Sequence, residues 1–293
     1  MSEPLFVDSK GREVALPDLG APVADTHAHL DMLDDPGLAL ANAARAHVEF
    51  VATVADPSED ASRTYDDLGS WLARAREVLD EEGLGETALP HVRAIVGVHP
   101  HNAKNLNAQV EGELRRLALH ALTAAIGEIG LDYHYDYSPR DVQREAFRRQ
   151  LQIAAEIGLP AVVHLREAHE DGEAILREIG VPAAGCILHC YNLGPELLER
   201  FLSLGCTVSF AGPATFKKAE DVRQAAAIVP LERILTETDC PFMAPEPFRG
   251  RTNEPAYVVF TAARVAQARG EEPATFGSAA YANARRLLDA VRP

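Results

Sequence analysis

Short apolar runs alternate along this chain with longer segments in which apolar residues recur at helical spacing. Apolar runs bounded by Gly and Pro are typical of buried strands, and segments with one apolar face are typical of packed helices. The predicted strands cover 22–27, 47–54, 91–98, 123–128, 160–164, 185–189, 206–211 and 233–238. The predicted helices cover 35–46, 58–82, 107–120, 139–157, 169–179, 195–204, 217–228 and 254–269. Eight strands alternating with eight helices predict an α/β fold, a TIM (β/α)8 barrel with parallel strands and right-handed crossovers.

The two ends of the chain lie outside this repeat. Residues 1–21 are polar and rich in Gly and Pro, and we expect them to form a short N-terminal extension. Residues 22–293 are expected to form a single barrel domain, because barrels of this class commonly reach such a length. A further helix over 273–289 is expected to pack on the outside of the barrel or to cover its bottom.

Composition limits the possible partners. The formal net charge is −16, which argues against a nucleic-acid coat protein, since such binders usually carry basic patches. It argues less against a nuclease, because two bound dications would add about +4 where a phosphate must sit. No apolar run is long enough to span a membrane, and the first residues do not have the pattern of a secretory signal. The four cysteines form no CxxC pair, so we expect them to be free thiols in a reducing cytoplasm. The sequence has no coiled-coil heptads, so we expect a monomer and predict no protein partner.

Histidines and acids that could bind metal follow or close several of the apolar runs. In a parallel barrel the carboxyl ends of the strands meet at one rim, where active sites lie. Each residue has a plainer interpretation, as a core histidine bonded to the backbone or as an acid in a turn. Their joint occurrence at strand ends favours a metal site, and residues i and i+2 of one strand point the same way. The candidate ligands are His27, His29, Glu128, His164, His189 and Asp239.

This set is large enough for two divalent ions if one carboxylate bridges them. Glu128 is the natural bridge, and a carbamylated lysine is excluded because no lysine ends an apolar strand. Two such ions can share a hydroxide and clamp the oxygens of a phosphate ester. Asp239 would also accept a proton from the water, which makes Asp239 and Glu128 the predicted catalytic pair. The imidazoles favour Zn²⁺, Mn²⁺, Co²⁺ or Ni²⁺ over Mg²⁺, without fixing the ion. The predicted sets are His27, His29, Glu128 and Asp239 on one ion, and Glu128, His164 and His189 on the other.

Several motifs, in this order, resemble the TatD family of metal-dependent deoxyribonucleases, within the amidohydrolase-like metallo-barrels. The resemblance implies a TIM barrel, two divalent ions, the same six ligands and hydrolysis of phosphodiesters in DNA, often from the 3′ end. Phe242 stands where the family more usually has Tyr, and Tyr191-Asn-Leu-Gly replaces an aromatic-Ser-Gly sequence, which bears on the substrate. The matching motifs are Asp25-Thr-His-Ala-His-Leu-Asp31, Gly97-Val-His-Pro-His101, Gly127-Glu-Ile-Gly-Leu-Asp-Tyr-His134, Val163-His-Leu-Arg-Glu-Ala168, Leu188-His-Cys190, Glu237-Thr-Asp-Cys-Pro-Phe-Met-Ala-Pro245 and Phe248-Arg-Gly-Arg-Thr-Asn-Glu-Pro255.

Other polar residues are expected to surround the ligands. Arginines near the rim could neutralise phosphate, and an acid two residues before a ligand could hold a ligand imidazole in one tautomer. A turn, a surface ion pair or a solvated loop is the rival interpretation for most of them. The candidates are His99, His101, Arg166, Glu237, Arg249 and Arg251.

The sequence thus predicts a metal-dependent hydrolase that cleaves DNA phosphodiesters, as a 3′ exonuclease, through a metal-bridging hydroxide. The alternative is a dinuclear-metal hydrolase of a small-molecule ester, lactone or cyclic amide, since fold does not fix function. The net charge favours this alternative mildly. A non-catalytic scaffold with a vestigial site is disfavoured by the intact ligand set.

Overall fold

The computed structural model describes residues 5–8 and 10–289. One sheet holds eight parallel strands in sequence order, and a bridge between Ala28 and Cys240 closes it into a barrel. Backbone hydrogen bonds from Asp239 to His27 and from His29 to Cys240, both 2.8 Å, complete this closure. The predicted barrel is therefore confirmed. The strands are β1 (Val23–Ala28), β2 (Val48–Ala55), β3 (His91–Val96), β4 (Thr123–Asp132), β5 (Ala161–Arg166), β6 (Cys186–Leu188), β7 (Thr207–Phe210) and β8 (Ile234–Thr236).

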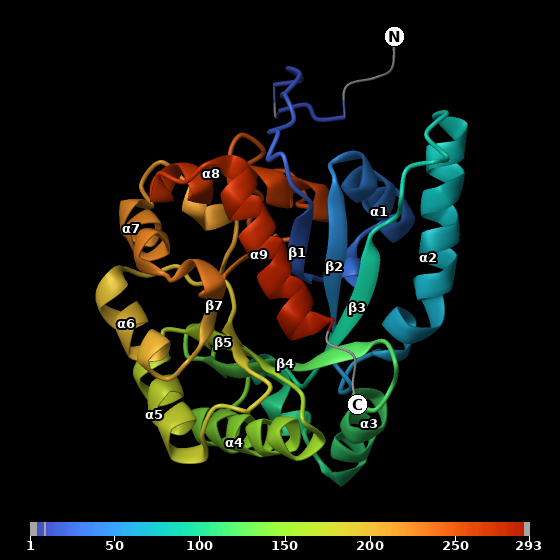
Figure 1. Cartoon of the computed structure of the whole chain (residues 1–293). Helices are drawn as coiled ribbons and strands as arrows, with labels where there is room; N and C mark the ends of the chain where they lie inside the picture. Colours follow the sequence, from blue (N-terminus) through green and yellow to red (C-terminus); the bar gives the residue numbers. More distant parts are fainter. Residues whose placement is uncertain (1–4, 9, 290–293) are drawn as a thin grey trace.

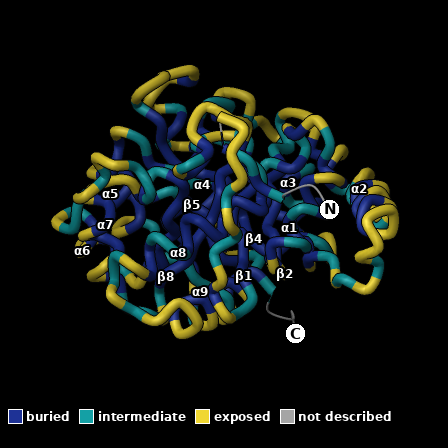
Figure 2. Tube along the Cα trace, turned by 90° about the horizontal axis from the view of Figure 1, so that it is seen from above, coloured by how far each residue is buried: buried dark blue, intermediate teal, exposed yellow. Residues whose placement is uncertain are grey.

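Helices form a ring around the strands (Figure 1). Each turns its apolar stripe to the sheet, as in α6, where Leu198 and Phe201 are fully buried while Glu199 and Arg200 are exposed. Seen from above, buried residues fill the centre and exposed ones the periphery (Figure 2). The helices are α1 (Pro36–Arg45), α2 (Ser62–Glu81), α3 (Ala108–Ala118), α4 (Arg140–Ile157), α5 (His169–Ile179), α6 (Pro195–Ser203), α7 (Glu220–Ile228), α8 (Val258–Arg269) and α9 (Pro273–Leu288).

The last helix, α9, crosses the front of the strands in Figure 1 and covers the amino-terminal end of the barrel. Asn283 donates from its side chain to the carbonyl of Ile234, the first residue of β8, at 3.1 Å. Leu287 and Leu288 pack in one cluster with Phe50 and Ile95 from the sheet. The extra C-terminal helix is thus confirmed, and its position leaves the carboxyl ends of the strands as the rim that can hold a site.

Two strands run further than the sequence predicts. Glu128 and His164 were expected to close their strands, but β4 continues to Asp132 and β5 to Arg166, so that expectation is wrong. Gly130 makes the continuation possible, because its φ of +145° is open to glycine and it pairs directly with His164. A Cβ atom at Gly130 would overlap the carbonyl oxygen of His164. Both candidate ligands therefore sit within strands, although the pairing of β4 with β5 shifts register between Ile126 and Ile129, beside Glu128.

The N-terminal segment is tied to the loop after β8. Phe6 is buried, and its ring lies 5.8 Å from that of Phe248 and 5.3 Å from that of Phe260. The guanidinium of Arg251 donates to the carbonyl of Val7. The division into a 1–21 extension and a 22–293 barrel domain stays a prediction. Within the described part of the chain, none of the helices combines the length and the apolar character that a membrane span requires.

Candidate metal centre

One group of candidate ligands lies where β1 meets the segment after β8. The Nε2 atom of His29 is 3.4 Å from Oδ1 of Asp239, and Nε2 of His27 is 3.7 Å from the same oxygen. Glu128 reaches this group from β4, with its Oε2 3.3 Å from Nε2 of His27. His27 and His29 thus converge from one strand, as the alternation of side chains requires.

A second group lies around the other oxygen of Glu128. Its Oε1 is 2.7 Å from Nδ1 of His164 and 2.7 Å from Nε2 of His189, and these two nitrogens are 3.3 Å apart. The carboxylate therefore faces His27 with one oxygen and the His164–His189 pair with the other. This is the arrangement that a bridging ligand between two ions needs.

The chemistry of the donor set can be tested against a bound cation. Both ring nitrogens of His27 and Nε2 of His164 are buried without a hydrogen-bond partner. Ligand atoms about 2.1 Å from a tetrahedrally coordinated zinc ion lie about 3.4 Å from one another. The separations of 3.3 Å between His27 and Glu128 and 3.4 Å between His29 and Asp239 match this spacing. The residues fit divalent metal ions.

Electrostatics keep the two carboxylates ionised. Burial acts to raise the pKa of Glu128, but the imidazoles of His189 and His27 outweigh it and hold the pKa well below its usual range. Burial likewise acts to raise the pKa of Asp239, whose contact with His29 nevertheless lowers it. Metal ligands of this type must be deprotonated, so both residues are in the form that binds cations.

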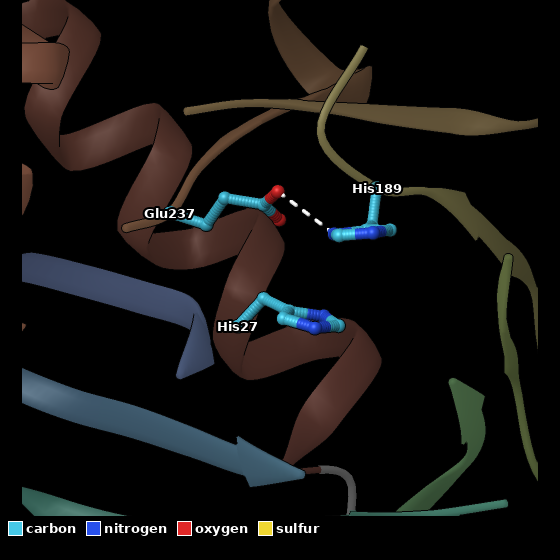
Figure 3. Close-up of side chains that lie close together, drawn as sticks. All are labelled: His27, His189 and Glu237. Atoms are coloured by element: carbon cyan, nitrogen blue, oxygen red, sulfur yellow. Dashed lines mark hydrogen bonds and ion pairs between the residues drawn. The ribbon is translucent and has the colours of Figure 1, made fainter. Parts of the chain in front are cut away.

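Glu237 orients one of the histidines. Its Oε1 lies 3.0 Å from Nδ1 of His189 and accepts a hydrogen bond from the backbone N–H of Cys190 at 2.7 Å. Figure 3 shows Glu237 directed at His189, with the ring of His27 beside it. With Nδ1 of His189 engaged by Glu237, Nε2 is left to face Glu128. This is the geometry by which an outer carboxylate fixes the tautomer of a metal-binding imidazole.

His99 and His101 follow β3 and contact two acids of the neighbouring strand β4. Nε2 of His99 is 3.8 Å from Oε1 of Glu128, and burial lowers the pKa of His99 well below its ordinary value. His101 contacts Asp132, with 2.9 Å between its Nε2 and Oδ2 of the acid. The same Oδ2 lies 3.4 Å from Nε2 of His164.

Asp132 was missed as a site residue by sequence reasoning. It lies four residues after Glu128, and side chains two or four residues apart on a strand share a face. The signal was therefore present, but it depended on knowing that β4 continues past Glu128 through Gly130.

The candidate arginines are not gathered at the ligands. The guanidinium carbon of Arg166 lies 4.7 Å from the ring centre of Tyr135, and that of Arg249 lies 4.2 Å from the ring centre of Phe216. Arg249 lines a cavity of about 690 Å³ together with Lys217 and Lys218. Arg251 is engaged by the carbonyl of Val7, as described above.

Comparisons with known proteins agree with this geometry. The family described as TatD related DNase matches residues 24–289. The uncharacterised metal-dependent hydrolase YcfH of Escherichia coli (strain K12) is 38% identical over 278 residues, covering 92% of this chain and 97% of that protein. The 3′-5′ ssDNA/RNA exonuclease TatD of Rahnella sp. (strain Y9602) is 34% identical over 219 residues, covering 73% and 83%.

A solved structure shows the same likeness in three dimensions. The TatD homologue YJJV of Escherichia coli K12 superposes with a TM-score of 0.76 at 26% identity, covering 92% of this chain and 98% of that one. The resemblance inferred from the motifs is thus confirmed. The chain belongs to the TatD-related DNase family of metal-dependent hydrolases.

Proposed function

We propose that this hydrolase is a nuclease that cleaves phosphodiester bonds in single-stranded DNA, starting at the 3′ end. The observation that carries the proposal is the carboxylate of Glu128, whose two oxygens face two separate groups of histidines. A relative that is 34% identical bears the name 3′-5′ ssDNA/RNA exonuclease, which supports the same substrate class here.

Two divalent ions are proposed to occupy the centre. When bound, such a pair supplies the Lewis acidity and positive charge that hydrolysis of a phosphate ester needs at neutral pH. The mixture of imidazoles and carboxylates suits Zn²⁺, Mn²⁺, Co²⁺ or Ni²⁺ better than Mg²⁺. His27, His29 and Asp239 would hold one ion, His164 and His189 the other, and Glu128 both.

The protein's own groups have distinct tasks in this proposal. Asp239, which is 9% exposed where Glu128 is 4% exposed, would accept the proton of the attacking water. Glu237 would keep the His189 ring in place, and His99 and His101 would orient the phosphate. Arg166, Arg249 and Arg251 would bind phosphates further along the strand.

We propose that the protein works as a monomer in the cytoplasm, without attachment to a membrane. Four free cysteines support a reducing compartment.

The net charge of −16 keeps a second candidate open, hydrolysis of a small-molecule ester, lactone or cyclic amide. One experiment separates the two. Purified protein with its metal content determined by elemental analysis is given 3′-tailed DNA, the same DNA with a blocked 3′ end, and a panel of small esters, lactones and cyclic amides. The proposal expects nucleotide release that requires the free 3′ end and is lost in Glu128→Ala. Turnover of the small molecules without release of nucleotides would reverse the assignment.

A further inference from the structure

Several cations of this acidic protein have no carboxylate partner among the residues that the structure describes. Many arginines on the outer helices pair with acids, as Arg148 does with Glu178 at 2.8 Å. Others there contact neutral groups instead, as Arg76 does with the carbonyl of Gly85 and Arg264 with the side chain of Gln267. Other cations, in the segments at the carboxyl ends of the strands, have no carboxylate oxygen within 4 Å among residues 5–8 and 10–289. These are Lys104, Arg166, Lys217, Lys218 and Arg249. Part of the rim therefore offers positive charge, whereas acids such as Asp31, Asp56 and Glu59 line the part that follows β1 and β2.

Two of these cations flank an exposed pair of tyrosines. Tyr135 and Tyr137 follow β4, and their rings lie parallel within 6°, with centres 5.2 Å apart. They are 46% and 58% exposed, among the most exposed large hydrophobic side chains of the described residues. The guanidinium carbon of Arg166 lies 4.7 Å from the ring centre of Tyr135, and Nζ of Lys104 donates to the carbonyl of Tyr137 at 3.0 Å. We call Tyr135 and Tyr137 the tyrosine platform.

The tyrosine platform is held in place by residues that border the metal centre. Oδ1 of Asp132 accepts the backbone N–H of Tyr135 at 3.1 Å, while Oδ2 lies 3.4 Å from Nε2 of His164. The ring of His101 meets Tyr135 and Tyr137 edge-on, at 5.5 and 4.9 Å between centres. A single carboxylate therefore connects the platform to a candidate ligand, and the two sites are neighbours on the rim.

We propose that the tyrosine platform binds a nucleobase of the single strand whose phosphate reaches the metal centre. An exposed aromatic face next to free cations is the combination that recognises single-stranded nucleic acid, because every base stacks and every linkage carries negative charge. A small lactone or ester would need neither. The inference rests on the proposed function and adds that a base of the DNA strand, as well as its phosphate, is recognised.

Binding is measured separately from cleavage. The fluorescence anisotropy of a 5′-labelled oligonucleotide with phosphorothioate linkages, which resist cleavage, is followed on the metal-loaded protein. Tyr137→Ala is expected to weaken binding about ten- to a hundredfold, and Tyr137→Phe, which keeps the ring, by less than about twofold. Tyr281→Ala, on α9 at the opposite end of the barrel, is the matched control and should bind as the wild type does.

A series of oligonucleotides with one abasic unit at successive positions from the 3′ end identifies the base. An abasic unit at one position should weaken the binding of the oligonucleotide to the wild type but not to Tyr137→Ala. The reason is that removing the base and removing the ring abolish the same stacking contact, so the second change has nothing left to remove. Equal sensitivity of both proteins at every position would overturn the inference, as would unaltered affinity of Tyr137→Ala. DNA cleavage with manganese by the wild type is scored independently, so binding through Tyr137 without cleavage would refute the proposed function alone. Failure of the wild type both to bind and to cleave would refute both.

Discussion

The imidazole of His27 lies almost parallel to that of His189, with 4.0 Å between ring centres and 18° between planes. His27 is fully buried, and neither of its ring nitrogens has a hydrogen-bond partner. A buried polar group without a partner costs about 1–3 kcal/mol of stability. A cation bound at Nε2 of His27 would satisfy one of these two nitrogens.

Removal of metal should therefore lower thermal stability. At a free metal concentration about a hundred times the Kd, binding contributes about 2.7 kcal/mol, which corresponds to roughly 4–5 °C in Tm for a chain of 293 residues. Differential scanning calorimetry with and without a chelator measures the shift. In His27→Asn the shift should shrink to a small fraction of that in the wild type. Identical melting of chelated and metal-loaded wild type would show that the centre holds no stabilising ion.

Glu237→Gln tests the role of the carboxylate that contacts His189. Loss of such an outer partner typically costs ten- to a hundredfold in metal affinity. We expect a decrease of about that size, measured by competition with a chromogenic chelator, with the barrel still folded by circular dichroism. Glu237→Ala should be weaker still, because Gln retains an acceptor for the N–H of Cys190. Unchanged affinity in both variants would remove Glu237 from the centre.

Gly130→Ala tests the extension of β4. The new Cβ would collide with the carbonyl of His164, and the φ of +145° disfavours any side chain. We expect destabilisation by about 3 kcal/mol or more in urea unfolding, with loss of metal binding because His164 shifts. Gly112→Ala is the matched control: its Cβ would meet no atom within 4 Å on the exposed face of α3, so it should be neutral or stabilising by up to about 1 kcal/mol. Equal effects of the two variants would contradict the role given to Gly130.

His169 predicts part of the acid sensitivity. Burial at the start of α5, together with the nearby imidazole of His164, lowers the pKa of His169 to about 4. The unfolded chain binds this proton below about pH 6.5, whereas the native chain binds it only below about pH 4. The free energy of unfolding therefore decreases as the pH is lowered from about 6.5 to about 4, and this histidine causes no further loss below pH 4. The loss amounts to about 2 kcal/mol between pH 7 and pH 5. His169→Leu should lose that much less over the same interval in urea titrations, and a parallel pH profile for the two proteins would rule the contribution out.

The sequence was sufficient for the barrel because each strand and helix carried its own periodicity. Candidate ligands could be selected because short runs such as Val163-His164 end in residues that a buried strand does not otherwise favour. The orientation of Glu237 toward His189 also follows from position, since residues 237 and 239 alternate with 238 on an extended segment.

What could not be predicted depends on contacts between distant strands. The continuation of β4 depends on the space beside His164, which no local pattern encodes, and Asp132 was overlooked for that reason. The partners of Arg166, Arg249 and Arg251 are aromatic rings and a carbonyl, brought near by loops whose paths are set by tertiary packing. From the residue types alone we could predict that these side chains are positively charged, but not which groups they contact.

The contact of Phe6 with Phe248 and Phe260 joins the beginning of the chain to a loop far along it, and Val7 and Arg251 are 244 positions apart. Detachment of the first residues would expose the aromatic surfaces of Phe248, Tyr257 and Phe260 together. A tag ahead of Phe6 would therefore be joined to a segment that packs directly on the loop that carries Arg249. For practical work with this protein, a fusion at the amino terminus is not a neutral choice.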